Sequence, residues 1–172
     1  MASSSVTDLW ETIAVEAAAE SPLWAEALIS EEQREPTPVF SPLGQARFAL
    51  GLETIYEGYL LHYGRPRLFS PADRHTSLLL GDYLYAHGLV RVADHNDVDA
   101  VADLAALISL CAQFRADESP GDGQAWAATA ALLGSRPLYG TREPAELEAA
   151  ARGVAGADAV AHALSLHAGR VS

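Results

Sequence analysis

The chain of 172 residues carries 23 acidic and 11 basic residues, which gives a formal net charge of −12 at pH 7. This excess of carboxylates argues against a nucleic-acid backbone as the main partner, because phosphate binding needs a basic surface. No uncharged apolar run of eighteen residues occurs, so we expect no membrane span. The start lacks the pattern of a secretory signal, and the single cysteine, Cys111, cannot form an internal disulfide. We therefore expect one cytoplasmic domain.

All of the basic residues are arginine, and lysine is absent from the chain. This usage, together with abundant alanine and glycine, is typical of coding bias in a GC-rich bacterium. The acidity itself most often serves solubility.

The N-terminal part predicts a helical arm over residues 1–35. Serine and threonine caps precede a first helix that ends near Glu20, and Ser21 with Pro22 starts a short second helix. Residues 36–43 contain three prolines and predict an extended linker.

Residues 44–172 predict a helical body. Apolar spacing and Gly/Pro breaks place its helices at about 44–63, 71–95, 98–116, 124–133 and from 143 onward. A loop is expected at 135–142, and Gly153 and Gly156 are candidate breaks in the last helix. No segment shows sustained strand alternation. The sequence therefore predicts an all-α bundle of about six or seven helices.

The helix expected at 71–95 is the longest apolar-periodic segment. Pro71 and Asp73 favour its first turn. Spacings of three and four residues predict that its buried face consists of Leu78, Leu79, Tyr83, Ala86 and Val90. Gly81 and Gly88 each disfavour a helix interior and therefore indicate close approach of another helix.

The segment Leu78–Ala86, with its Gly-Asp-Tyr-Leu-Tyr-Ala string, resembles the helix that follows the first aspartate-rich motif of trans-polyprenyl diphosphate synthases. The following helix, from Val98 to Ala116, is similar to theirs as well. The resemblance covers about residues 45–117. It implies the all-α isoprenoid-synthase fold and a site for an isoprenoid chain.

The chain departs from that family at the catalytic motif. The family carries Asp-Asp-x-x-Asp upstream of this helix to bind magnesium and diphosphate, whereas residues 53–67 contain no paired aspartates. The second aspartate-rich motif is also missing. The resemblance therefore implies a shortened relative comparable to the non-catalytic small subunit of two-component prenyl synthases, with no cofactor. Magnesium is expected only if a reduced enzyme persists.

One candidate ligand site combines carboxylates and arginines. Glu53 and Glu57 are four residues apart on one helix face, and Asp82 lies on the next helix, so the three could meet around a magnesium ion. The alternative is that both glutamates face solvent while Asp82 bonds locally. The only basic cluster could hold an anion, or it could pair with acidic groups; it consists of Arg65, Arg67 and Arg74.

Other site patterns are better explained structurally. The histidines near the central helices do not form the Glu-x-x-His pairs of di-iron bundles. Residues 94–99 resemble the start of a calcium loop but lack its glycine and its last carboxylate, so Asp97 is expected to cap a helix. Cys111 is expected to pack in the core.

The predicted helices at 44–63 and 71–95 carry more tyrosines than their two buried faces can hold. We expect these helices to pack antiparallel and to offer an association face. Its residues are Tyr56, Tyr59, Tyr83 and Tyr85.

Three functions follow as expectations. The first is a non-catalytic subunit that forms a homo-oligomer or joins a larger prenyl-synthase-like partner. The second is a small binding protein for an isoprenoid or other apolar ligand. The third is a degenerate magnesium-dependent prenyl transferase, which would need its carboxylates close together.

Overall fold

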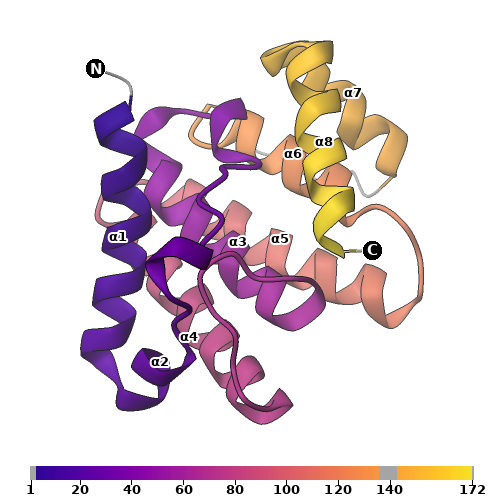
Figure 1. The fold of residues 1–172 in the computed structure, drawn as a ribbon. Helices are drawn as coiled ribbons and strands as arrows, with labels where there is room; N and C mark the ends of the chain where they lie inside the picture. The colour runs from indigo at the N-terminus through magenta and orange to yellow at the C-terminus, as the bar shows by residue number, and fades with distance from the viewer. Residues whose placement is uncertain (1–2, 136–142, 172) are drawn as a thin grey trace.

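The computed structural model describes residues 3–135 and 143–171, and in these ranges it contains eight α-helices and no strand (Figure 1). This confirms the all-α class. The expected loop at 135–142 lies outside the described residues except for Ser135. The helices are α1 Ser3–Glu20, α2 Pro22–Ala27, α3 Ala49–Tyr63, α4 Arg74–Ala93, α5 Val98–Ala116, α6 Asp122–Leu132, α7 Pro144–Ala155 and α8 Ala157–Val171.

Side-chain caps and one glycine set several of the helix boundaries. Ser21, Asp73 and Asp97 accept hydrogen bonds from backbone N–H groups in the first turns of α2, α4 and α5. Capping by Asp97 is as predicted, while α4 starts after Asp73 and not at Pro71. Gly156 has φ +91° and separates α7 from α8, because a left-handed residue ends a helix.

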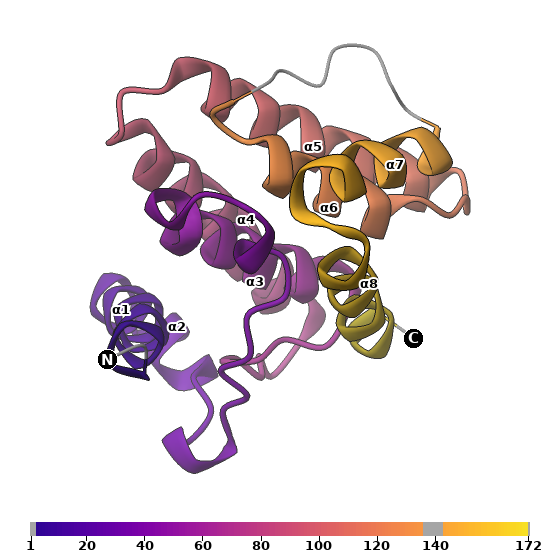
Figure 2. The ribbon, with the colours of Figure 1, turned by 90° about the horizontal axis from the view of Figure 1, so that it is seen from above.

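Helix α3 lies near the middle of the molecule, with α1 and α2 on one side and α6 and α8 on the other (Figure 2). Every residue from Gly51 to Leu61 is buried. A helix that is covered on all sides needs no polar face. The central helix therefore forms the axis on which the other helices pack.

Helices α3 and α4 pack antiparallel, as predicted, with two pairs of glycines at the contact. A Cβ atom built on Gly51 would lie 3.3 Å from the carbonyl oxygen of Gly88, and one on Gly58 would lie 2.8 Å from that of Gly81. The two glycines of each helix are seven residues apart, so both pairs fall on the same face. The missing side chains let the two backbones approach closely.

The predicted buried face of α4 is wrong. Leu79 and Val90 are 58% and 57% exposed, whereas Leu80, Leu84 and Val92 are buried. The apolar residues of α4 surround much of the helix, so spacing alone did not identify the face. The glycine contacts with α3 select the face that contains Gly81 and Gly88.

The N-terminal arm packs on the body through a small apolar cluster of its own. In this cluster Trp10 and Ile13 of α1 join Leu68, Phe69 and Leu80. The proline-rich segment 36–43 also takes part in the packing. Its Phe40 belongs to the main core, where the ring stacks on Trp126 with centroids 5.7 Å apart.

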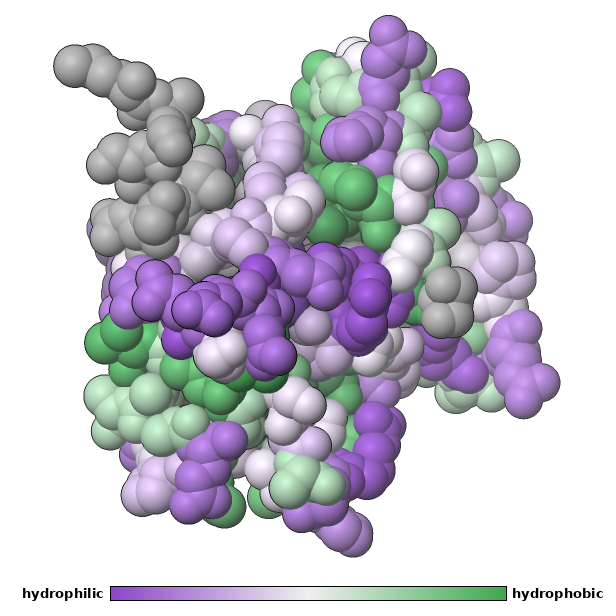
Figure 3. All heavy atoms as spheres, viewed as in Figure 1, coloured by the Kyte–Doolittle hydropathy of each residue, from purple (hydrophilic) through white to green (hydrophobic). Residues whose placement is uncertain are grey.

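One face of the molecule carries a band of hydrophilic side chains over the short 3-10 turn Glu31–Gln33 (Figure 3). All three residues of this turn are exposed. None of the described helices has the length and apolar character needed to cross a membrane.

Candidate functional site

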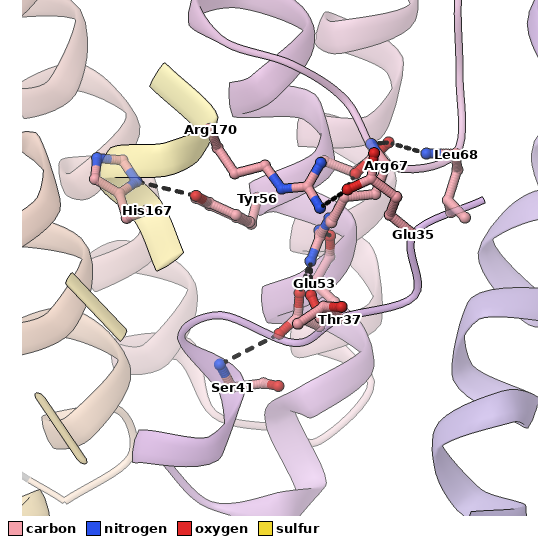
Figure 4. A network of polar contacts seen from close by, with 10 residues as sticks. Glu35, Thr37, Ser41, Glu53, Tyr56, Arg67, Leu68, His167 and Arg170 are labelled. Atoms are coloured by element: carbon pink, nitrogen blue, oxygen red, sulfur yellow. Dashed lines mark hydrogen bonds and ion pairs between the residues drawn. The ribbon is translucent and has the colours of Figure 1, made fainter. Parts of the chain in front are cut away.

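A buried ion-pair network joins α3 to the loop that follows it (Figure 4). Arg67 Nη1 lies 2.6 Å from Glu53 Oε2, and Arg67 Nε lies 2.9 Å from Glu57 Oε2. The three side chains are at most 1% exposed. Spacing of four residues places both carboxylates on one side of α3, so a single guanidinium can bind them together.

Backbone groups complete the hydrogen bonding of this network. Glu57 Oε1 accepts the N–H groups of Arg67 and Leu68, each at 2.8 Å. Glu53 Oε1 accepts the N–H of Ser41 at 3.3 Å, and Arg67 Nη1 donates to the carbonyl oxygen of Thr37 at 3.0 Å. The network thus ties the 37–41 segment and the 67–68 segment to α3.

Electrostatics keep the central cation charged. Burial lowers the pKa of Arg67, but the two carboxylates outweigh this effect and raise the pKa above its ordinary value. The guanidinium also lies over the Trp10 ring, 4.4 Å from its centroid, and 5.0 Å from that of Tyr56. Arg67 is therefore enclosed by charges and rings of the chain itself.

The structure does not gather the six predicted ligand residues into one site, which corrects that prediction. Glu53, Glu57 and Arg67 bind one another and are closed to solvent. Asp82 is on the surface, 69% exposed, and its Oδ1 lies 3.0 Å from His62 Nε2. The two remaining arginines are separate: Arg65 is exposed, and Arg74 donates to the carbonyl oxygens of Leu61 and His62.

The predicted association face is corrected for two of its four tyrosines. Tyr56 and Tyr59 are 1% and 0% exposed, because α3 is covered on all sides. Tyr83 and Tyr85 are half-buried. The Tyr83 ring packs against Trp24 with centroids 5.9 Å apart, and the Tyr85 ring stacks on His62 at 5.0 Å.

The hydroxyls of the two buried tyrosines connect α3 to α6 and α8. The Tyr56 hydroxyl lies 2.9 Å from His167 Nδ1, and the Tyr59 hydroxyl donates to Asp122. Burial raises the pKa of both tyrosines. These hydroxyls therefore stay protonated and act as hydrogen-bonding groups of the core.

Asp122 is the centre of a second polar cluster that sequence reasoning missed. Its Oδ2 accepts from Arg115 Nε at 2.8 Å, and its Oδ1 lies 3.9 Å from His167 Nε2. Burial raises the pKa of Asp122, but interactions with His167, Tyr59 and Arg115 outweigh this and hold the pKa well below its usual range. In the sequence, Asp122 lies in the break before the helix predicted at 124–133, and no local pattern distinguishes it.

We expect Asp122→Asn to lower the free energy of unfolding by about 1–3 kcal/mol at pH 7, since charged hydrogen bonds are lost from a largely buried group. Because the fold lowers the pKa of Asp122, the ionised carboxylate stabilises the folded state at pH values above the pKa of the unfolded chain, which is near the ordinary value of 3.8. This stabilisation decreases as the pH falls below that value toward the pKa of the folded state. The difference between the two proteins should therefore shrink from pH 7 to pH 3. Urea unfolding at both pH values measures it, with exposed Asp94→Asn as control. An equal difference at both pH values would contradict this role.

The outer sides of α4 and α5 carry exposed apolar side chains. Six large hydrophobic residues of the described chain are prominently exposed, and three of them are Leu79, Val90 and Val98 on these two helices. Val98 is the most exposed, at 80%. We define the α4–α5 surface by nine exposed apolar residues of these two contacting helices: Leu79, Ala86, Val90, Ala93, Val98, Ala102, Ala105, Ala112 and Ala116.

Charges are sparse along this surface. Between Leu79 and Ala93 the ionisable Asp, Glu, His and Arg residues are Asp82, His87 and Arg91, and between Val98 and Ala116 they are Asp99, Asp103 and Arg115. Along α5 the exposed positions 98, 102, 105, 109, 112 and 116 follow the alternating spacing of four and three residues that coiled coils use. All of these residues are small except Val98.

Comparison with family models, curated proteins and solved structures finds no match for this chain. The all-α fold therefore stands on the structure itself, and the resemblance to prenyl synthases stays a hypothesis. Within residues 3–135 and 143–171, no group of three or more His, Cys, Asp or Glu side chains is placed to hold a metal ion.

Proposed function

We propose that this chain is a non-catalytic helical protein that acts by associating with a second protein chain, either another copy or a larger partner. The observation that carries the proposal is the exposure of Leu79, Val90 and Val98 on the α4–α5 surface. Exposed apolar residues that gather on neighbouring elements are typical of protein–protein contact sites.

The distribution of charge also favours the α4–α5 surface as the site of association. Two copies of a chain with a net charge of −12 repel each other. A contact is least costly where carboxylates are few, and the outer sides of α4 and α5 meet that condition. The small residues along α5 would also let a partner helix approach closely.

The class of a hetero-partner follows only from the sequence resemblance. That resemblance spans α3, α4 and α5 and implies a larger prenyl-synthase-like subunit. A reduced magnesium-dependent enzyme is less well supported, because Glu53, Glu57 and Arg67, which it would need, neutralise one another in the core.

Sedimentation equilibrium tests the proposal with the double variant Val90→Glu/Val98→Glu. Each substitution removes apolar area worth about 1.5 kcal/mol or more and adds a charge, so we expect self-association to weaken by about 100-fold or more. The matched control is Val154→Glu on α7, because Val154 is 55% exposed and lies outside the surface. Circular dichroism should show unchanged helicity in both proteins.

Two results would contradict this assignment. One is a wild-type protein that stays monomeric up to about 1 mM, where even weak complexes form, and that also fails to bind a co-expressed candidate partner. The other is an equal loss of association in the Val154→Glu control, which would show that added charge alone is responsible.

A further inference from the structure

Helices α4 and α5 are joined by residues 94–97 and run antiparallel from that turn (Figure 2). They contain 20 and 19 residues, so each is about 30 Å long. Two contacting helices lie about 8–10 Å apart, and their outer side therefore offers roughly 600 Å². This is the lower end of what each partner contributes to a specific protein interface, about 600–1,000 Å². The α4–α5 surface is thus large enough for a dimer.

The exposed positions of α5 are symmetric about the centre of the helix. Counted from Leu107, they lie nine, five and two residues away in both directions, as Val98 and Ala116, Ala102 and Ala112, and Ala105 and Ser109. A second α5 that crosses antiparallel at Leu107 would bring the members of each pair together. At least one member of every pair is alanine or serine, so no two large side chains collide and the helices can approach closely.

The exposed positions of α4 have a centre of symmetry at nearly the same height. Leu79 and Ala93 lie seven residues to either side of Ala86, and all three are exposed. Ala86 precedes the end of α4 by seven residues, and Leu107 follows the start of α5 by nine. The two centres are therefore about 10 Å and 14 Å from the turn, a difference of less than one helical turn. A single two-fold axis can pass both helices, as a closed contact between identical chains requires.

The two ends of this helix pair carry unmatched charges of opposite sign. Asp94 and Asp99 are exposed at the turn, and Arg74 and His75 are exposed at the far end of α4. Among the described residues, none of these four side chains takes part in an ion pair. Arg74 donates only to backbone carbonyl oxygens. Each end therefore lacks the charge that the other end offers.

Negative charge accumulates at the turn. Burial raises the pKa of Asp103, and the neighbouring Asp99 and Asp97 raise it further. Two turns packed against each other would bring these carboxylates together with those of the second copy, and like charges across an interface are costly. An antiparallel arrangement instead places each turn over the partner's cationic end.

We infer that the partner is a second copy of this chain, and that the two α4–α5 surfaces pack face to face about a two-fold axis at the level of Ala86 and Leu107. Four helices then form one antiparallel bundle across the interface, with each turn beside Arg74 and His75 of the other copy. This inference rests on the proposed association through this surface and names its partner and its geometry.

Disulfide trapping tests the arrangement. Ala102→Cys and Ala112→Cys change exposed positions that face each other only across the two-fold axis. Identical positions of the two copies would be about 15 Å apart along the helix, whereas a disulfide needs Cα atoms within about 7 Å. An oxidised mixture of the two single variants should therefore contain about tenfold more disulfide-linked dimer than either variant alone. Wild-type protein, whose one thiol at Cys111 is buried, measures the background.

A second pair of variants reports the opposite orientation. Ala93→Cys and Val98→Cys change exposed positions beside the turn, and they would meet across an interface only if two turns packed on each other. We expect no more linked dimer in their mixture than in either variant alone. Linked dimer in this mixture, with none in the mixture of the position 102 and 112 variants, would overturn the inference.

Sedimentation equilibrium of the wild type separates this inference from the proposed association. A dimer that shows no link between positions 102 and 112 keeps the association but refutes the two-fold geometry. A monomer that binds a larger co-expressed partner also keeps the association, and it refutes the second copy as partner. A monomer that binds neither overturns both.

Charge exchange gives an independent test in the same sedimentation experiment. His75→Asp should weaken self-association about tenfold, because it places a carboxylate opposite the acidic turn twice in each dimer. Asp94→Arg added to the same chain should restore most of the loss. If Asp94→Arg alone strengthens association and His75→Asp has no effect, the turns face each other and the inference is wrong.

Discussion

Replacing Arg67 by methionine is expected to lower the free energy of unfolding by about 3–5 kcal/mol, the cost of leaving a buried charge without its partner. The substitution removes the bonds at 2.6 Å and 2.9 Å to Glu53 and Glu57. Both carboxylates would then be buried together with no cation between them. Urea unfolding at pH 7, followed by circular dichroism at increasing denaturant, measures the loss.

The adjacent exposed arginine provides the control. Arg65→Met changes the same residue type two positions away, and a surface substitution of this kind should stay within about 0.5 kcal/mol of wild type. Arg67→Lys should fall between the two, because a lysine keeps the charge but loses the planar fork that binds both carboxylates. If Arg67→Met unfolds at the wild-type urea concentration, the network does not hold the core together.

The glycine contacts between α3 and α4 lead to the second large effect. Gly58→Ala should lower the free energy of unfolding by about 1–3 kcal/mol, as overpacked cores do. Its new Cβ would lie 2.8 Å from the carbonyl oxygen of Gly81 and 3.0 Å from the Tyr85 ring. The nearer atom belongs to backbone, so the two helices would have to separate. Thermal unfolding of the wild type and the variant checks this.

A second glycine in a helix supplies a control with the opposite sign. A Cβ on Gly153 of α7 meets no described atom within 4 Å. Gly153→Ala should therefore raise stability by about 0.5–1 kcal/mol, since alanine restricts the unfolded chain more than glycine does. If Gly58→Ala raises stability as Gly153→Ala does, helix propensity and not close approach governs Gly58.

The fold class and most helix positions could be predicted from the sequence because they depend on local signals. Asp97 caps α5 and Gly156 ends α7, and each works within a few residues of its own position. Gly81 and Gly88 likewise predict a close helix contact, because glycine is unfavourable inside a helix unless another helix approaches there. Only the structure shows that Gly58 and Gly51 face them.

The site residues were harder to predict because their partners are distant in sequence. Glu53 and Glu57 were correctly placed on one side of a helix, but their common partner Arg67 comes from a loop whose path the sequence does not define. The number of tyrosines on α3 and α4 predicts an association face that includes Tyr56 and Tyr59, because two inward stripes cannot hold all of them. Helix α3 has no exposed side between Gly51 and Leu61, and its coverage depends on α8, more than a hundred residues later.

The position of α3 has a consequence for how the chain folds during synthesis. This helix is complete at Tyr63, but its Tyr56 hydroxyl finds His167 only in α8. Translation proceeds at about 5–20 residues per second, so roughly 5–20 s pass between the synthesis of α3 and that of α8. During this time the apolar side chains of α3 lack the contacts that α8 later provides. Contacts of such long sequence separation also slow folding. The nascent chain is accordingly expected to depend on chaperones until α8 emerges and the two helices meet.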